Sequence, residues 1–267
     1  MIREPAVAGQ FYPGAKPELF KMVSGLVNKN ATQKKALGIV SPHAGFIYSG
    51  IVSGAVFSGV KPAASYIVIG PNHTGRGRPF SLMKIGAWLT PFGRIQVNKR
   101  LAGDLLKRSR FLQDDPVAHA FEHSVETQIP FVQFVNEGAT FVPIILSNAG
   151  VDIYREIGND IAESIKQYPS DVLIVASSDM THYEQQKIVV DKDKEAINAI
   201  LELDEEKLLK KIKDFDISMC GYAPVVVMLC AAKKLGAKHA ELVKYQTSGD
   251  ASGDYSAVVG YAGIIVS

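Results

Sequence analysis

Five short runs of consecutive apolar residues, rich in β-branched side chains, form the clearest pattern along this chain. They cover residues 37–40, 66–69, 141–146, 172–176 and 258–266. Because these runs do not alternate apolar with polar positions, they predict strands that are covered on both faces. The pattern therefore indicates a sheet in the interior of the protein.

Between these runs, apolar residues recur at the spacing of amphipathic helices. The predicted helices cover residues 17–27, 49–57, 100–108, 124–136, 151–167, 192–201, 205–212 and 225–235. Strands that alternate with helices favour a three-layer α/β/α fold around a central mixed, largely parallel sheet. No linker or internal repeat divides the 267 residues, so we expect a single domain, 1–267.

Composition excludes several classes of protein. No apolar run approaches the roughly 20 residues that span a bilayer, so we expect no membrane segment. Glu4, Pro5 and Pro13 interrupt the stretch that a signal peptide would need, which predicts a cytoplasmic protein. The net charge is only +2, and the lysines of residues 207–213 are spaced as a solvated helix face, so we expect no nucleic acid partner.

Motif searches narrow the chemistry further. The chain has no Walker lysine loop, no GxGxxG after a strand, no GxSxG elbow and no HExxH. Nucleotide binding, serine hydrolase chemistry and the common zinc protease site therefore receive no support.

Three histidines follow predicted strands directly, at His43, His73 and His182. In open α/β sheets, ligands bind beyond the carboxyl ends of the strands, where these histidines would meet. Pro42 and Pro71 stiffen the backbone before two of them, and Gly45 and Gly70 allow tight turns nearby. This placement favours a site over three unrelated surface histidines.

Two further segments could complete such a site. Residues 122–126 open a predicted helix, whose spacing places Glu122 and Glu126 on one side with His123 next to it; a charged helix start is the alternative interpretation. Cys220 lies just before another predicted helix, where free N–H groups would lower the thiol pKa. Cys230 falls within an apolar helix and is interpreted as a core residue.

Together these residues supply imidazole, thiolate and carboxylate ligands. Such a set suits a borderline metal, and iron, copper and zinc all remain open.

The motifs resemble those of the Memo family, and they occur in the same order. The matching segments, which extend over essentially the whole chain, are residues 42–45, 70–73, 122–126, 177–182, 220–221, 248–250 and 259–263. The resemblance implies a fold like that of the class III extradiol ring-cleavage dioxygenases. It also implies metal ligands at His43, His73 and Cys220.

The same resemblance assigns polar pocket roles, which we interpret as catalytic, to four residues: Asp179, His182, His123 and Glu126. Cys220 departs from the dioxygenase pattern of two histidines and a carboxylate around iron, so dioxygenase activity does not follow from the fold.

Two hypotheses of function follow. In the first, the chain is a redox enzyme that uses iron or copper to act on an unknown small molecule or peptide, with His182 or His123 moving protons. In the second, it is a non-catalytic copper- or iron-binding or adaptor protein, for which the resemblance implies a radical-SAM-associated protein partner. Zinc-dependent hydrolysis, with Glu126 or Asp179 as base, and metal-free recognition of a peptide or anion are further alternatives.

Overall fold

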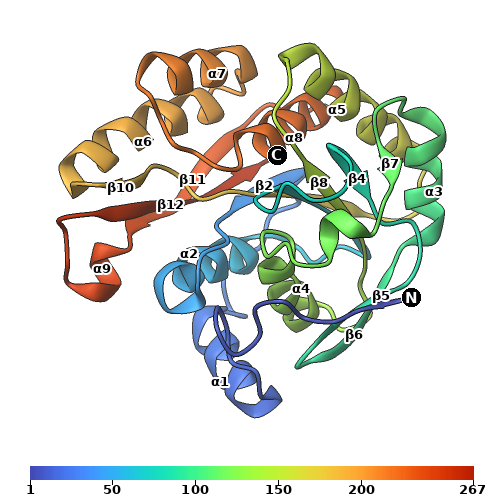
Figure 1. The fold of residues 1–267 in the computed structure, drawn as a ribbon, viewed down its shortest axis with the longest axis horizontal. Helices are drawn as coiled ribbons and strands as arrows, with labels where there is room; N and C mark the ends of the chain where they lie inside the picture. The colour runs from blue at the N-terminus through green and yellow to red at the C-terminus, as the bar shows by residue number, and fades with distance from the viewer.

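A twelve-stranded mixed sheet organises the protein, whose computed structural model describes residues 1–267 (Figure 1). Its main path runs in the order β1-β5-β6-β8-β3-β9-β2-β12-β10, with β11 beside β12 and β4 and β7 beside β8. The strands are β1 (Ile2–Arg3), β2 (Gly38–Ser41), β3 (Ser65–Pro71), β4 (Phe80–Leu82), β5 (Ala87–Thr90), β6 (Gly93–Val97), β7 (Gln113–Asp114), β8 (Thr140–Leu146), β9 (Val172–Ser177), β10 (His182–Glu184), β11 (Ala240–Thr247) and β12 (Val258–Val266).

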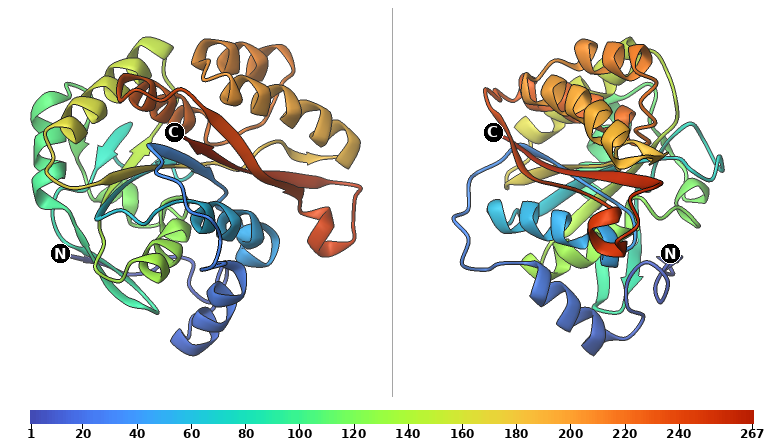
Figure 2. Two further views of the ribbon diagram at one scale, coloured as in Figure 1. Left: turned by 180° about the vertical axis from the view of Figure 1, so that it is seen from behind. Right: turned by 90° about the vertical axis from the view of Figure 1, so that its left-hand side faces the viewer.

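Helices cover both faces of this sheet (Figures 1 and 2). One face carries α1 (Lys16–Leu26), α2 (Phe46–Gly59) and α4 (Ile129–Val135). The other carries α3 (Lys99–Arg108), α5 (Val151–Lys166), α6 (Gln186–Leu201), α7 (Glu205–Asp214) and α8 (Tyr222–Lys234), while the short α9 (Gly249–Ser252) lies beyond β11. The predicted α/β architecture with a mixed, largely parallel sheet between helical layers is confirmed.

The centre of the sheet is parallel. Strands β6, β8, β3, β9 and β2 all run in one direction, and Ile67 of β3 pairs with Val142 on one side and Ile174 on the other. These three side chains are fully buried. Coverage on both faces explains why the apolar runs in the sequence do not alternate.

The five predicted strands and eight predicted helices all have observed counterparts, and one of the helices differs in an instructive way. The segment predicted as a helix over residues 124–136 begins with a 3-10 turn, Glu126–Gln128, and becomes α-helical only at Ile129. Pro130 follows at once, and proline suits the first helical turn because it has no N–H to leave unpaired. The strands that sequence patterns missed are mostly short or partly polar, such as β1, β4 and β7.

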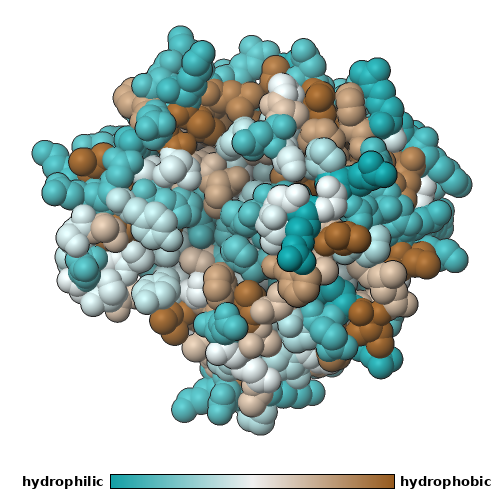
Figure 3. All heavy atoms as spheres, in the orientation of Figure 1, coloured by the Kyte–Doolittle hydropathy of each residue, from teal (hydrophilic) through white to brown (hydrophobic).

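The outer surface mixes polar and apolar side chains. On the face drawn in Figure 3, hydrophobic residues lie in small patches among hydrophilic ones. None of the helices has both the length and the apolarity that crossing a bilayer requires.

Helices α5 and α8 pack closely over the sheet. A Cβ at Gly158 of α5 would lie 2.7 Å from Cys230 Cβ and 2.8 Å from the Val227 carbonyl oxygen of α8. Cys230 is 6% exposed within the main hydrophobic cluster, as predicted for a core residue. Gly158 therefore sets how closely the two helices approach.

We expect Gly158→Ala to destabilise the protein by about 1–3 kcal/mol, because the added methyl group must push α8 away from α5. Gly103→Ala in α3 is the matched control, since its Cβ would meet only Lys84 Cε at 3.8 Å. That substitution should stabilise by up to about 1 kcal/mol through helix propensity. Urea unfolding of both variants tests the prediction, and equal stabilities would contradict it.

Candidate metal centre

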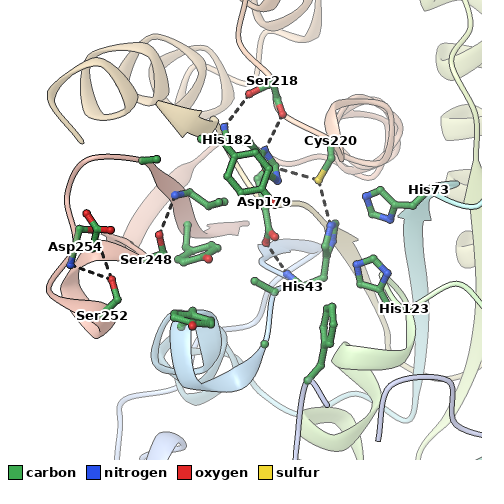
Figure 4. Close-up of a pocket in the computed structure, with 18 residues that line it drawn as sticks. His43, His73, His123, Asp179, His182, Ser218, Cys220, Ser248, Ser252 and Asp254 are labelled. Carbon is green, nitrogen blue, oxygen red and sulfur yellow. Dashed lines mark hydrogen bonds between the residues drawn. The ribbon is translucent and has the colours of Figure 1, made fainter. Parts of the chain in front are cut away.

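The carboxyl ends of three neighbouring strands bring the candidate residues together. In the parallel register, Ser41 at the end of β2 pairs with Ser177 at the end of β9, and β3 pairs with the other side of β9. His43, Asp179 and His73 follow these strand ends and line one cavity. Figure 4 shows His43, His73, His123 and Cys220 gathered on one side of it.

Hydrogen bonds fix the protonation pattern of His43. The single hydroxyl proton of Ser177 is donated to the Ser124 carbonyl oxygen at 2.6 Å, so Ser177 Oγ must accept from His43 Nδ1, which lies 3.0 Å away. The ring is 2% exposed, and burial together with His123 and His73 holds its pKa well below the usual range. His43 Nε2 therefore carries the lone pair of the ring.

His73 is held in the same way by Glu122. The carboxylate accepts the His73 backbone N–H at 2.7 Å and lies 2.9 Å from Nδ1, which must donate. Burial raises the pKa of Glu122, but hydrogen bonds from His73 and Ser124 outweigh burial and hold this pKa at about 2. An ionised carboxylate behind an imidazole orients the ring and strengthens Nε2 as a ligand.

His123 belongs to the same cluster. Its ring stacks on His73 with centroids 4.7 Å apart and an interplanar angle of 12°. Potential ligand atoms of His43, His73 and His123 all lie within 4.8 Å of one another. The sequence placed His123 among the pocket residues, and the structure adds it to the candidate ligands.

Backbone packing explains how His123 reaches the site. Gly70 lies within β3 and forms no turn, contrary to the expectation from sequence. A Cβ at this position would lie 2.3 Å from Ser124 Oγ, so glycine allows the loop that carries Glu122 and His123 to lie against β3.

Cys220 lies beside His43, with Sγ 3.1 Å from Nε2. It precedes α8 by two residues, as the sequence indicated, but the predicted low thiol pKa is wrong. Burial, and then the nearby Asp179, raise the pKa of the Cys220 thiol far above its ordinary value. Desolvation of the thiolate outweighs the helix N-terminus, so the thiol is protonated in the protein alone.

Asp179 and His182 form the middle of the cavity. Asp179 Oδ1 accepts the His43 backbone N–H at 2.7 Å, and burial raises the pKa of this carboxyl to about 6. His182 Nδ1 lies 3.0 Å from the Ser218 carbonyl oxygen, which can only accept, so Nε2 is unprotonated in the neutral ring. Both side chains therefore present polar atoms to the cavity.

Glu126, the remaining pocket residue suggested by sequence, does not line the cavity. It is fully buried and accepts hydrogen bonds from Arg3, Tyr12 and the backbone of residues 6 and 7. The expected helical face shared with Glu122 does not form, because the chain turns before Glu126. Glu126 anchors the amino-terminal segment against the loop that carries His123.

The cavity has a volume of about 750 Å³. Sequence reasoning missed much of its lining, which comes from the amino-terminal segment, α2, β10, the loop before α8 and the carboxyl-terminal hairpin: Phe11, Tyr48, Tyr183, Ser218, Ser248, Ser252, Asp254, Ala257, Val259 and Tyr261. The matching segments at residues 248–250 and 259–263 were the signals that pointed to the hairpin.

The donor atoms suit a borderline metal ion. His43 and His73 both present an Nε2 lone pair, and His123 offers a third nitrogen within 4.8 Å of them. Cys220 Sγ lies 3.1 Å from His43 Nε2 but falls outside this group of mutually close donors. This cluster could therefore hold a metal ion.

Comparison with known proteins agrees with the motif pattern. A family model described as "Memo-like protein" matches residues 3–265. A MEMO1 family protein of Pyrobaculum aerophilum is 40% identical over 99% of this chain and 98% of its own, and one of Methanopyrus kandleri is 38% identical over 99% of both. An uncharacterized Escherichia coli protein of known structure shares the fold, with a TM-score of 0.61 and 11% identity over 86% of this chain and all of its own.

We expect Glu122→Gln to reduce the acid sensitivity of the fold. The pKa of Glu122 falls from an ordinary 4.5 to about 2 in the folded protein, so its stabilising contribution is present above pH 4.5 and is lost as the pH falls toward 2. Urea unfolding between these pH values should show a shallower slope for Glu122→Gln than for the parent. Glu18→Gln, at an exposed position in α1, is the control; an unchanged slope in Glu122→Gln would refute the assignment.

Proposed function

We propose that this chain, which belongs to the Memo family, holds a redox-active iron or copper ion at His43, His73 and Cys220 and uses dioxygen as the electron acceptor to oxidise a small organic substrate. One observation carries the proposal. Ring nitrogens of His43, His73 and His123 lie within 4.8 Å of one another, and Cys220 Sγ lies 3.1 Å from His43 Nε2, at the end of a cavity of about 750 Å³ that also contains candidate proton carriers. A site that served structure alone would be closed by protein ligands.

The ligand set favours iron or copper over zinc. Thiolate and imidazole together suit a soft or borderline ion that can change its oxidation state. Metal binding would displace the proton of Cys220, which offsets the cost of holding a buried thiolate. His123 lies close enough to serve as a further ligand or to guide protons beside the cluster.

The ion would supply the redox chemistry, and the surrounding residues would handle substrate and protons. His182 Nε2 can accept a proton from a bound substrate, because the Nδ1 hydrogen bond to Ser218 leaves it free. The Asp179 carboxyl, with a pKa raised to about 6, can hold or release a proton near neutral pH. The neutral His123 ring also lines the cavity and packs against Phe11, with the two ring centroids 4.9 Å apart.

A second candidate function is copper binding without turnover. The contact between Cys220 Sγ and His43 Nε2, at 3.1 Å, brings together the two ligand types that copper(I) prefers. The outcome that separates the candidates is tight, stoichiometric copper(I) binding with no substrate oxidation.

Metal content tests the ligand set. After anaerobic reconstitution with iron(II) or copper(I), we expect near-stoichiometric metal in the parent and loss of metal from His43→Ala, His73→Ala and Cys220→Ser. His239→Ala, at an exposed histidine before β11, is the matched control and should retain the metal. If His123→Ala loses the metal and Cys220→Ser retains it, the third ligand is His123 and not Cys220.

Turnover tests the redox role. Metal-loaded protein should consume oxygen with at least one member of a panel of phenols, amines and thiols. We expect His182→Ala to lower kcat by about 10²–10⁴-fold at unchanged metal content, because a positioned proton acceptor contributes that much. Equal rates in His182→Ala and His239→Ala would remove His182 from the reaction, and absence of turnover throughout would favour the copper-binding candidate.

A further inference from the structure

The cavity extends well beyond the candidate ligands. In Figure 4, Asp179 and His182 lie in the middle, and Ser248, Ser252 and Asp254 lie on the side away from the histidine cluster. Three tyrosines, Tyr48, Tyr183 and Tyr261, also line it. We call the part of the cavity surface formed by these three tyrosines, together with the Asp179 carboxylate, the aromatic wall.

Tyr261 carries an unused polar group. The side chain is only 2% exposed, yet its hydroxyl makes no hydrogen bond within the protein, unlike the buried hydroxyls of Tyr12, Tyr154 and Tyr245. Burial, then Asp179, Tyr183 and Tyr48, raise the pKa of Tyr261 well above its ordinary value, so the phenol stays neutral. Because Tyr261 lines the cavity, this hydroxyl is available to pair with a bound ligand.

An irregularity in the pairing of β10 with β12 places Tyr183 at this wall. β10 pairs with β12 through His182 and Glu184, whose partners are Val259 and Val258, and the register shifts between them. Tyr183 takes the left-handed conformation, with φ of 58°, which is unfavourable for a tyrosine. The bulge lets successive side chains, His182 and Tyr183, both reach the cavity instead of opposite faces of the strand.

Charge distinguishes the kinds of ligand that would fit. None of the residues that line the cavity is lysine or arginine, whereas two are aspartates, Asp179 and Asp254. Hydrogen bonds from Ser256 lower the pKa of Asp254, which keeps it ionised. Carboxylates among aromatic rings attract a cation and repel an anion, because ring faces carry partial negative charge.

We propose that the aromatic wall binds the protonated amine of the substrate, so that the substrate class is an organic amine with an aromatic or apolar body. The ammonium group donates hydrogen bonds to the Asp179 carboxylate and the Tyr261 hydroxyl, and the rings of Tyr48 and Tyr183 flank it. The rest of the molecule extends past His182 toward the histidine cluster. The claim that the amine is the substrate rests on the proposed function. The claim that the cavity binds an amine does not.

The proposal is tested by measuring amine binding to metal-free protein. A negative result then cannot be caused by failure of the metal chemistry. The probes are 2-phenylethylamine, the uncharged 2-phenylethanol and the anionic 3-phenylpropionate, measured by isothermal titration calorimetry after treatment with a chelator. We expect saturable binding of 2-phenylethylamine at millimolar or lower concentration and none of the other two. Binding of the alcohol or the acid as tightly as the amine would overturn the proposal, as would lack of amine binding.

Two conservative variants locate the site. Asp179→Asn keeps an oxygen that can accept the His43 N–H but removes the charge, and should weaken amine binding by about 10-fold or more. Tyr261→Phe removes only the unpaired hydroxyl and should weaken it by about 5-fold. Tyr255→Phe, at a half-exposed tyrosine outside the cavity lining, is the matched control. Unfolding temperatures check that each variant folds, and parent-like affinity in both Asp179→Asn and Tyr261→Phe would place the amine elsewhere.

Discussion

The parallel pairing of β2, β9 and β3 is the constraint on which the site depends. It aligns three strand ends at one edge of the sheet, so that His43, Asp179 and His73 follow at neighbouring positions. Because side chains on both faces of these strands are packed in the core, a shift in register would require both helical layers to repack. The site is therefore held by the same packing that stabilises the fold.

Buried polar groups then convert this placement into defined chemistry. The Ser177 hydroxyl and the Glu122 carboxylate each hold the Nδ1 proton of a histidine and leave Nε2 free. The ionised Glu122 carboxylate is buried and would be costly without the hydrogen bonds from His73, His123 and Ser124. Those hydrogen bonds also fix the loop that brings His123 beside His73. Stability and ligand geometry thus come from the same interactions.

The cavity has two chemically different ends. At one end are neutral imidazoles and a thiol, which are suited to a metal ion; at the other are tyrosines and aspartates, which are suited to a cation. His182, which lies between them, can accept a proton from the substrate. A substrate that spans this space would be held by its charge at one end and would react at the other, which makes the proposed binding and redox roles compatible.

The sequence by itself determined the central strands, most helices and the positions of His43, His73, Asp179 and His182, because covered parallel strands leave unbroken apolar runs with functional residues at their ends. Tertiary structure alone decided three further points. It brought His123 into the histidine cluster and directed Glu126 to Arg3, since both depend on where the loop turns against Gly70 and β3. It raised the pKa of Cys220, since burial depends on neighbours far along the chain. It also placed Tyr261 of the matching segment 259–263 in the cavity lining, because contacts between distant segments leave no periodic signal in the sequence.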